Sequence, residues 1–209
     1  MRHMRQKAPR PLMIAVGGLS GSGKTTLARG LRDRMPGSVM LDSDEVRKEM
    51  HGVSPETPLP DSAYTPENTA AFIQYIRSRA ETLLRQNKTV IVAGLFLDNK
   101  SRFEQQSLAE RCGAGFIGLY IDVPLGVLYD SVAGRKKAAS DADRGVVERQ
   151  VRAAVNGQQG LHWHVVDGNR LPDDVLRSAS AVVLHELRRF RLRDSLPPKA
   201  PNGPPGPMG

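Results

Sequence analysis

Residues 12–31 read LMIAVGGLSGSGKTTLARGL, and this stretch decides the fold. Its apolar start, residues 12–16, predicts a buried strand, and the spacing of residues 27–31 predicts a helix. Between them lies a complete G-x-x-x-x-G-K-[ST] motif. The residues that we assign to nucleotide binding are Gly18, Ser20, Gly21, Ser22, Gly23, Lys24, Thr25 and Thr26. A glycine-rich loop between a strand and a helix is the arrangement that a nucleoside triphosphate site requires.

Each residue type in this motif suits a triphosphate. The glycines let the backbone wrap closely around phosphate groups with its N–H groups pointing inward, and the N-terminus of the following helix favours negative charge. Lys24 is placed to reach the β- and γ-phosphates, and the Thr25 hydroxyl is placed to hold Mg²⁺. An ordinary Gly/Ser turn leading into a helix is the alternative, but the pattern with its flanking strand and helix favours the nucleotide site.

Apolar, β-rich runs recur along the chain with helical segments between them. The predicted strands are residues 12–17, 38–41, 89–94, 115–122 and 163–167. The predicted helices between and after the later strands are residues 69–86, 100–111, 124–133 and about 173–193. This alternation predicts an α/β fold, a three-layer sandwich in which helices cover both faces of a five-stranded parallel sheet.

Charge and composition suggest where the domain begins and ends. The 209 residues suit one domain, predicted at 11–194. The net charge of +8 lies in the ends of the chain: residues 1–10 carry four basic and no acidic residues, and residues 188–209 carry five basic and one acidic residue. We expect a flexible basic tail over 1–10 and a disordered, Pro- and Gly-rich tail over 195–209. The basic excess therefore says little about the domain's substrate.

The sequence favours neither a membrane span nor a secreted protein. No run approaches the ~20 apolar residues that a transmembrane helix needs, and the N-terminus lacks the apolar region of a signal peptide. The single Cys112 excludes an internal disulfide and fits a reducing compartment. We therefore expect a cytoplasmic protein with no membrane partner.

Acidic side chains follow the second predicted strand directly, in the run Asp42-Ser43-Asp44-Glu45-Val46-Arg47. We expect this strand beside the first, which brings these acids near the γ-phosphate. Asp42 is then a candidate metal ligand, and Asp44 a candidate to accept a proton from an attacking hydroxyl. Arg47, one helical turn later, is expected to face the same cleft and to suit an anionic or hydroxylated acceptor. The alternative, that Asp42 or Ser43 caps a short helix, is compatible with these roles.

The motifs GLSGSGKTTLA, LDSDEVRKEMHGV, SPETPLPDSAYTPE and ASDAD resemble the small P-loop kinases of the gluconate kinase, adenylylsulfate kinase and polynucleotide kinase group. This group includes AAA-type ATP-binding and zeta-toxin-like kinase domains, and the similarity runs from about residue 12 to 170. The resemblance implies a P-loop NTPase fold with ATP and Mg²⁺ as cofactors. It also implies that Asp44 is the base or holds a Mg²⁺-bound water, and that Arg47 binds the acceptor.

The resemblance further implies a short helical lid, which here spans residues 133–145. This segment is basic and polar and lies between two predicted helices. Arg135 is the residue expected to close over the phosphates and to stabilise charge in the transition state. Arg144, Arg149 and Arg152 are secondary candidates for the same task.

One departure from the family pattern concerns the end of the third predicted strand. Related chains carry an acid and a Thr or Asn there, whereas this chain has Ala93 and Leu95. Two polar groups expected near the metal or the acceptor are therefore missing. Asp98 follows a few residues later and is not assumed to replace them.

The prediction is an ATP- and Mg²⁺-dependent kinase that phosphorylates a hydroxyl of a small-molecule acceptor. A 5′-hydroxyl polynucleotide kinase is one alternative. The spacing of Asp44 and Arg47 permits a nucleic-acid partner, but only 5% of residues are Phe, Trp or Tyr, which does not favour one. A non-catalytic ATP-binding module is the second alternative, because Ala93 and Leu95 replace the expected polar residues.

Overall fold

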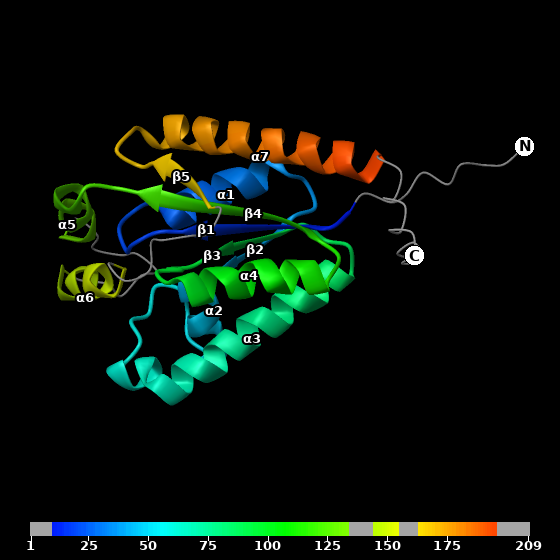
Figure 1. Ribbon diagram of the computed structural model, residues 1–209. Helices are drawn as coiled ribbons and strands as arrows, with labels where there is room; N and C mark the ends of the chain where they lie inside the picture. Colours follow the sequence, from blue (N-terminus) through cyan, green and yellow to red (C-terminus); the bar gives the residue numbers. More distant parts are fainter. Residues whose placement is uncertain (1–9, 134–143, 155–162, 196–209) are drawn as a thin grey trace, which may run out of the picture.

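A five-stranded parallel sheet lies at the centre of the computed structural model, which describes residues 10–133, 144–154 and 163–195 (Figure 1). Its strands are β1 (Leu12–Gly17), β2 (Val39–Asp42), β3 (Val90–Ala93), β4 (Gly115–Asp122) and β5 (His164–Asp167), in the order β2-β3-β1-β4-β5. The register sets Ala93 beside both Val16 and Asp42. The carboxyl ends of β1, β2 and β3 therefore meet at one edge, where open α/β sheets bind ligands.

Helices cover both faces of this sheet. α1 (Lys24–Arg34) and α7 (Pro172–Ser195) pack together on one face, and α3 (Pro66–Arg85) and α4 (Asn99–Arg111) lie on the other (Figure 1). The remaining elements are α2 (Ser43–Met50), the 3-10 turn η1 (Asp61–Tyr64), α5 (Leu125–Ala133) and α6 (Arg144–Ala154). The predicted α/β fold with three layers is confirmed.

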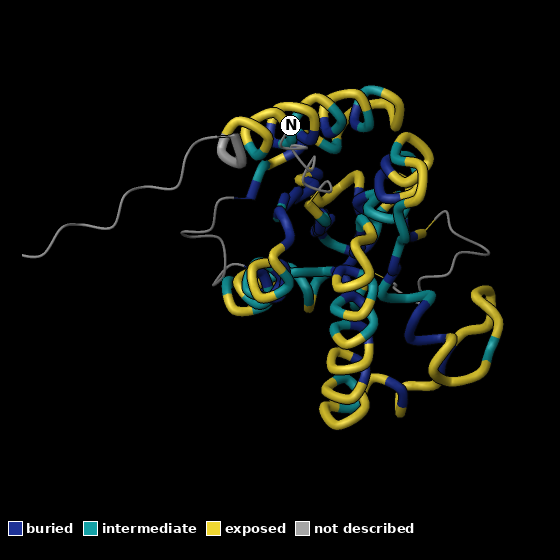
Figure 2. The backbone as a smooth tube through the Cα atoms, turned by 90° about the vertical axis from the view of Figure 1, so that its right-hand side faces the viewer, coloured by how far each residue is buried: buried dark blue, intermediate teal, exposed yellow. Residues whose placement is uncertain are grey.

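The core has two halves because successive side chains of a strand point to opposite faces of the sheet. Ile14 and Val16 of β1 pack with Leu31 of α1 on one side, whereas Met13 packs with Ile76 of α3 on the other. Figure 2 shows the result, with buried strands at the centre and exposed outer faces on the long helices. Strands covered on both faces are continuous apolar runs, which explains why residues 12–16 contain no polar side chain.

Short polar side chains start the helices around the carboxyl edge of the sheet. Asp42 caps α2, Thr65 caps α3 just before Pro66, and Asp98 caps α4 through the backbone N–H of Ser101. Such caps satisfy backbone N–H groups that have no partner within the helix. The predicted cap at Asp42 is thus confirmed. The Asp98 side chain caps α4, so it is engaged at a helix start and does not substitute for the polar groups missing from β3.

One prediction about the sheet is wrong. We expected β2 beside β1, but β3 lies between them and pairs with both. The physical reason is burial: β3 is buried along its whole length and takes the interior position, whereas β2 starts half-buried and takes the edge. Asp42 therefore reaches the phosphate loop across the end of β3.

The other predicted elements agree with the structure apart from small shifts at their ends. Most of the predicted tails over 1–10 and 195–209 lies outside the described residues, as does the lid between Ala133 and Arg144, with Arg135. Within residues 10–133, 144–154 and 163–195, no helix is long and apolar enough to cross a membrane.

Candidate active site

The loop between β1 and α1 has a backbone shape that only glycine adopts readily. Gly18, Gly21 and Gly23 have φ values of 145°, 88° and 88°. A Cβ atom on Gly18 would lie 2.7 Å from the Oγ of Ser22 and 2.8 Å from the carbonyl oxygen of Ile121, so a side chain does not fit there. The glycines of the motif are therefore required by the fold of the loop itself.

The start of α1 suits an anion. Gly23 occupies the N-cap position, and no described side chain caps the helix there or adds an acid to its first turn. Its first N–H groups therefore present uncompensated positive character to the loop. The Oγ of Ser22 is also buried and has no hydrogen-bond partner among the described residues. The ammonium group of Lys24 bends back over the loop and donates to the carbonyl oxygen of Leu19 at 2.9 Å. These groups fit a triphosphate.

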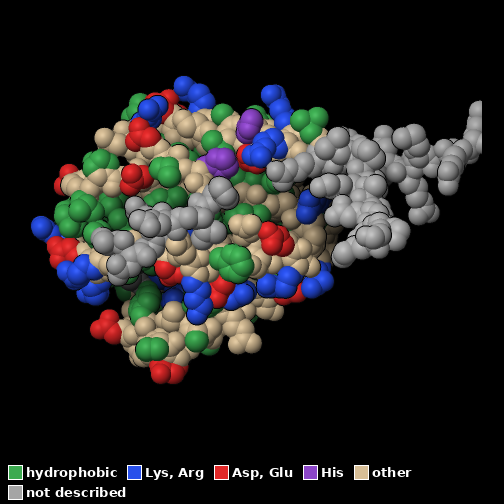
Figure 3. All heavy atoms as spheres, viewed as in Figure 1, with side chains coloured by type: hydrophobic (Ala, Val, Ile, Leu, Met, Phe, Trp, Pro, Cys, Tyr) green, Lys and Arg blue, Asp and Glu red, His purple; other side chains and the backbone are tan. Residues whose placement is uncertain are grey.

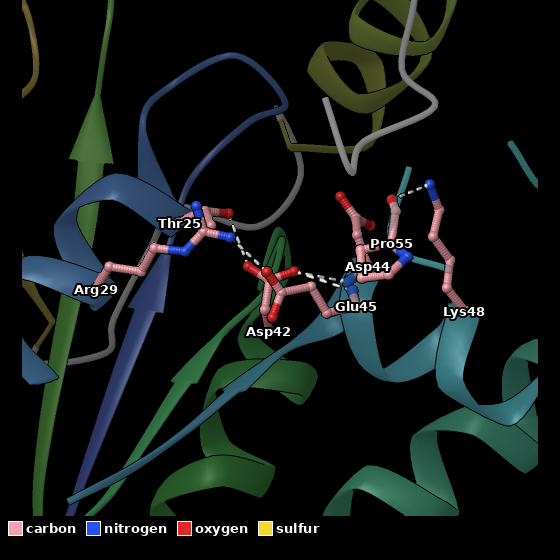
Figure 4. A network of polar contacts seen from close by, with 7 residues as sticks. All are labelled: Thr25, Arg29, Asp42, Asp44, Glu45, Lys48 and Pro55. Atoms are coloured by element: carbon pink, nitrogen blue, oxygen red, sulfur yellow. Dashed lines mark hydrogen bonds and ion pairs between the residues drawn. The ribbon is translucent and has the colours of Figure 1, made fainter. Parts of the chain in front are cut away.

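Two residues assigned to the metal lie in direct contact, as Figure 4 shows. The Thr25 hydroxyl, in the first turn of α1, donates to Oδ2 of Asp42 at 2.7 Å. Oδ1 of Asp42 accepts from the backbone N–H groups of Asp44 at 2.9 Å and of Glu45 at 3.2 Å. A hydroxyl next to one buried carboxylate fits Mg²⁺, which keeps several waters and takes further ligands from substrate phosphates.

A cavity of about 660 Å³ opens beside the phosphate loop. Its walls come from the loop, the start of α2, residues 58–64, the inner face of α3, the end of β3, α4 and α6. Lys24, Asp44 and Arg47 all line it. The carboxylate of Asp44 points away from Asp42 (Figure 4), so the two acids serve different sides of the site. The structure thus places the predicted acceptor residues and the phosphate loop around one space.

Arg47 is built into the wall of this cavity. Its guanidinium group donates to the carbonyl oxygen of Ala63 at 3.0 Å and lies over the rings of Phe72, at 4.1 Å, and Tyr64, at 5.0 Å. Burial lowers the pKa of Arg47, while Tyr64 and Asp44 oppose that shift. The group remains charged near neutral pH, because arginine has a very high intrinsic pKa. Arg47 is therefore a fixed cation with a defined direction.

Backbone contacts and apolar side chains occupy the end of β3 and the residues after it, where the resemblance led us to expect polar groups. Ala93 is buried, and the carbonyl oxygen of Leu95 accepts from the N–H of Gly18 at 3.2 Å. Phe96 has a φ of 45°, and its carbonyl oxygen accepts from Nε of the buried Arg102 at 2.8 Å. The segment therefore supports the phosphate loop through its backbone and adds apolar surface to the cavity.

Sequence reasoning missed Gln150 on α6. Its Oε1 accepts from the N–H of Ser20 at 2.9 Å, and its Nε2 contacts the Oγ of Ser20, also at 2.9 Å. Arg149, a secondary candidate, lines the cavity next to it. The separation of 130 positions between Ser20 and Gln150 explains the omission, because spacing along the chain does not reveal such a contact. Arg144, another candidate, is paired with Glu148.

Several known proteins are similar to this chain in sequence. The AAA domain family matches residues 13–155. The adenylyl-sulfate kinase of Myxococcus xanthus (strain DK1622) is 35% identical over 115 residues, which is 53% of this chain and 57% of that protein. An uncharacterized protein of Mycobacterium tuberculosis (strain ATCC 25618 / H37Rv) is 29% identical over 134 residues, 62% of this chain and 27% of that protein. The chain thus spans just over half of the first relative and about a quarter of the second.

A solved gluconokinase from Sinorhizobium meliloti 1021 has the same fold. It superposes with a TM-score of 0.62 at 19% sequence identity, over 88% of this chain and 98% of that one. The likeness confirms the P-loop kinase fold that the sequence predicted. Because the family match covers most of the chain, including the phosphate loop, Asp44 and β3, the chain belongs to the AAA domain family.

Proposed function

We propose that this protein is a Mg²⁺-dependent kinase that transfers the γ-phosphoryl group of ATP to a hydroxyl of a small molecule. One observation carries the proposal: the phosphate loop and the Asp44 carboxylate line the same cavity of about 660 Å³. A cavity of this size holds a small molecule whose hydroxyl is near both the carboxylate and a triphosphate on the loop. The names of the Myxococcus and Sinorhizobium relatives, which are kinases, support the same reaction class.

The residues divide the chemistry between them. Bound with Mg²⁺, ATP supplies the γ-phosphoryl group, whose bond to the ADP oxygen breaks as a bond forms to the acceptor oxygen. Thr25 and Asp42 would hold the metal ion, and Asp44 would orient the acceptor hydroxyl and take its proton. Lys24 and the N-terminus of α1 balance the negative charge that moves onto ADP. Arg47 positions the acceptor. Arg135 is assigned to stabilise the negative charge of the phosphates in the transition state.

A nucleic-acid acceptor receives less support. Figure 3 shows basic and acidic side chains interspersed on the face drawn there, whereas a nucleic-acid site gathers basic residues into a patch or stripe. The apolar end of β3 supports a different second candidate, an ATP-binding module without transfer activity, since Ala93 and Leu95 offer no polar side chain there.

Substitution of Lys24 tests the kinase proposal. The purified protein is incubated with Mg²⁺ and γ-labelled ATP in a dialysed metabolite mixture, and mass spectrometry identifies any labelled product. We expect a product with the wild type, and a loss of at least about a hundredfold in Lys24→Ala, because the cation that balances the transferred charge is gone. Asp44→Asn is the matched variant, which we expect to bind ATP normally and to transfer far less of it.

Two results would contradict the proposal in different ways. ATP binding without any labelled product would support the non-catalytic module. Full activity of Lys24→Ala would remove the phosphate loop from the mechanism.

A further inference from the structure

The cavity is mainly apolar away from the phosphate loop. α3 contributes Phe72, Ile73 and Ile76 to the wall, and the end of β3 contributes Ala93 and Leu95. Phe72 and Ile76 are buried, whereas Ile73 is 41% exposed and also lines a second cavity on the same side of the molecule. Exposed apolar surface inside a concave site marks the place where an apolar part of a ligand is covered.

The charges around the cavity balance each other. Apart from Lys24, which belongs to the phosphate loop, the basic side chains in the wall are Arg47, Arg77 and Arg149, and the acidic ones are Asp44, Asp61 and Glu104. Arg77 and Glu104 form an ion pair at 3.2 Å. Among the described residues, the wall away from the phosphate loop thus has no net charge, which gives a strongly anionic acceptor no electrostatic advantage there.

Gln105 supplies a neutral polar group within this wall. It lies on α4, lines the cavity, and is only 8% exposed. Its side-chain amide makes no hydrogen bond to any other described residue. The amide atoms keep access to the cavity, so a ligand atom there can complete their hydrogen bonding.

We propose that the phosphoryl acceptor is a neutral, amphiphilic alcohol. Its apolar body packs against Phe72, Ile73 and Ile76, a carbonyl, amide or second hydroxyl bonds to Gln105, and its reacting hydroxyl lies toward Asp44. This inference rests on the kinase function proposed above and names its substrate class. Anionic acceptors and highly hydroxylated ones, such as free sugars, fit the wall less well, because its described charges balance and Phe72, Ile73 and Ile76 make one side of it apolar.

Three probes separate these classes on the full chain. N-acetyl-L-phenylalaninol combines an aromatic ring, an amide and a primary hydroxyl without charge, whereas sorbitol is highly hydroxylated and glycerol 3-phosphate is anionic. Ligand-observed NMR titrations in the presence of Mg²⁺ and ADP give the dissociation constants. We expect the first probe to bind at least about tenfold more tightly than the other two, the scale of discrimination that an apolar pocket provides.

Two variants locate the binding within the cavity. Ile73→Ser and Gln105→Met should each weaken binding of N-acetyl-L-phenylalaninol by at least about threefold, through loss of apolar contact and of the amide respectively. Leu184→Ser and Gln106→Met are matched controls outside the cavity, and both should bind like the wild type. Thermal melts of all variants confirm that each is folded.

The outcomes for the acceptor class and for the kinase function are distinct. Preferential binding of sorbitol or glycerol 3-phosphate, or equal binding by wild type and both cavity variants, would overturn the acceptor class. Phosphoryl transfer is followed separately by ³¹P NMR after ATP is added. Transfer to an anionic or highly hydroxylated probe alone would keep the kinase and overturn this inference. Selective binding of the neutral alcohol would support the inference, provided that transfer does not go to one of the other probes alone.

Discussion

At the scale of single residues, Asp42 joins two tasks. One carboxylate oxygen accepts two backbone N–H groups at the start of α2, and the other accepts the Thr25 hydroxyl. The sequence suggested both a helix cap and a metal ligand; the cap uses Oδ1, which leaves Oδ2, now in contact with Thr25, for the proposed metal. The cap fixes the direction of the carboxylate, so the metal role depends on the helix start.

Asp42→Asn should separate these tasks. Asparagine caps helices about as well as aspartate, so we expect the free energy of unfolding to change by less than about 0.5 kcal/mol. The loss of charge should weaken Mg²⁺-dependent ATP binding by about tenfold or more, because Mg²⁺ prefers carboxylate oxygens. Isothermal titration with and without Mg²⁺ measures the effect.

Asp42→Ala is the comparison for the cap. It removes the cap as well and should cost about 0.5–2 kcal/mol of stability in a denaturant melt. Unchanged Mg²⁺ dependence in Asp42→Asn would show that Asp42 does not serve the metal.

At the scale of elements, α6 and the phosphate loop are joined by Gln150. Its two contacts with Ser20 hold the first half of the loop, while the end of β3 holds Gly18 from the other side. Glycine-rich loops are intrinsically free in conformation, so external contacts determine how much freedom is lost when a ligand binds. The helix that follows the predicted lid thus helps to shape the loop for its ligand.

Gln150→Ala should therefore weaken ATP binding, because it releases Ser20 of the phosphate loop from its two contacts with α6. Two neutral hydrogen bonds are worth roughly 1–3 kcal/mol together, so we expect an increase in the dissociation constant of about tenfold. Hydrogen exchange should become faster in α6 and in the loop, because each loses the other as a partner. Gln106→Ala on α4 is the control, since among the described residues the Gln106 amide bonds to Glu110 on its own helix and not to the phosphate loop.

Neither effect would be seen if the Gln150 contacts were incidental. Slower hydrogen exchange in α6, or unchanged affinity for ATP, would contradict a positioning role.

At the scale of the whole molecule, the sequence predicted local features better than contacts between distant segments. The phosphate loop, the strands and the helix cap at Asp42 were readable because glycine content, apolar runs and capping residues act over a few positions. The order of β2 and β3 could not be predicted from local patterns. β2 follows β1 in the sequence, but the position next to β1 is taken by β3, which comes later in the chain. Gln105 and Gln150 were missed for the same reason, because only the fold brings their helices to the cavity.

The phosphate loop connects both halves of the core, so ligand binding should stabilise the entire fold. It continues from β1 into α1, contacts β3 through Gly18, and reaches β2 through the bond of Thr25 to Asp42. A ligand at one hundred times its dissociation constant adds about 2.7 kcal/mol to the free energy of unfolding. For a domain of this size that corresponds to a rise in Tm of roughly 5–10 °C.

Thermal melts with Mg²⁺ and ATP, with ATP and a chelator, and without ligand measure this shift. We expect the full rise only with the metal present, because Thr25 and Asp42 contribute through Mg²⁺. Lys24→Ala should show little of the rise at the same ATP concentration, because the variant is expected to fold normally but to bind ATP more weakly. An equal rise in Lys24→Ala would place the ATP site elsewhere. A full rise in the presence of chelator would remove the metal role from Thr25 and Asp42, while leaving the phosphate loop as the nucleotide site.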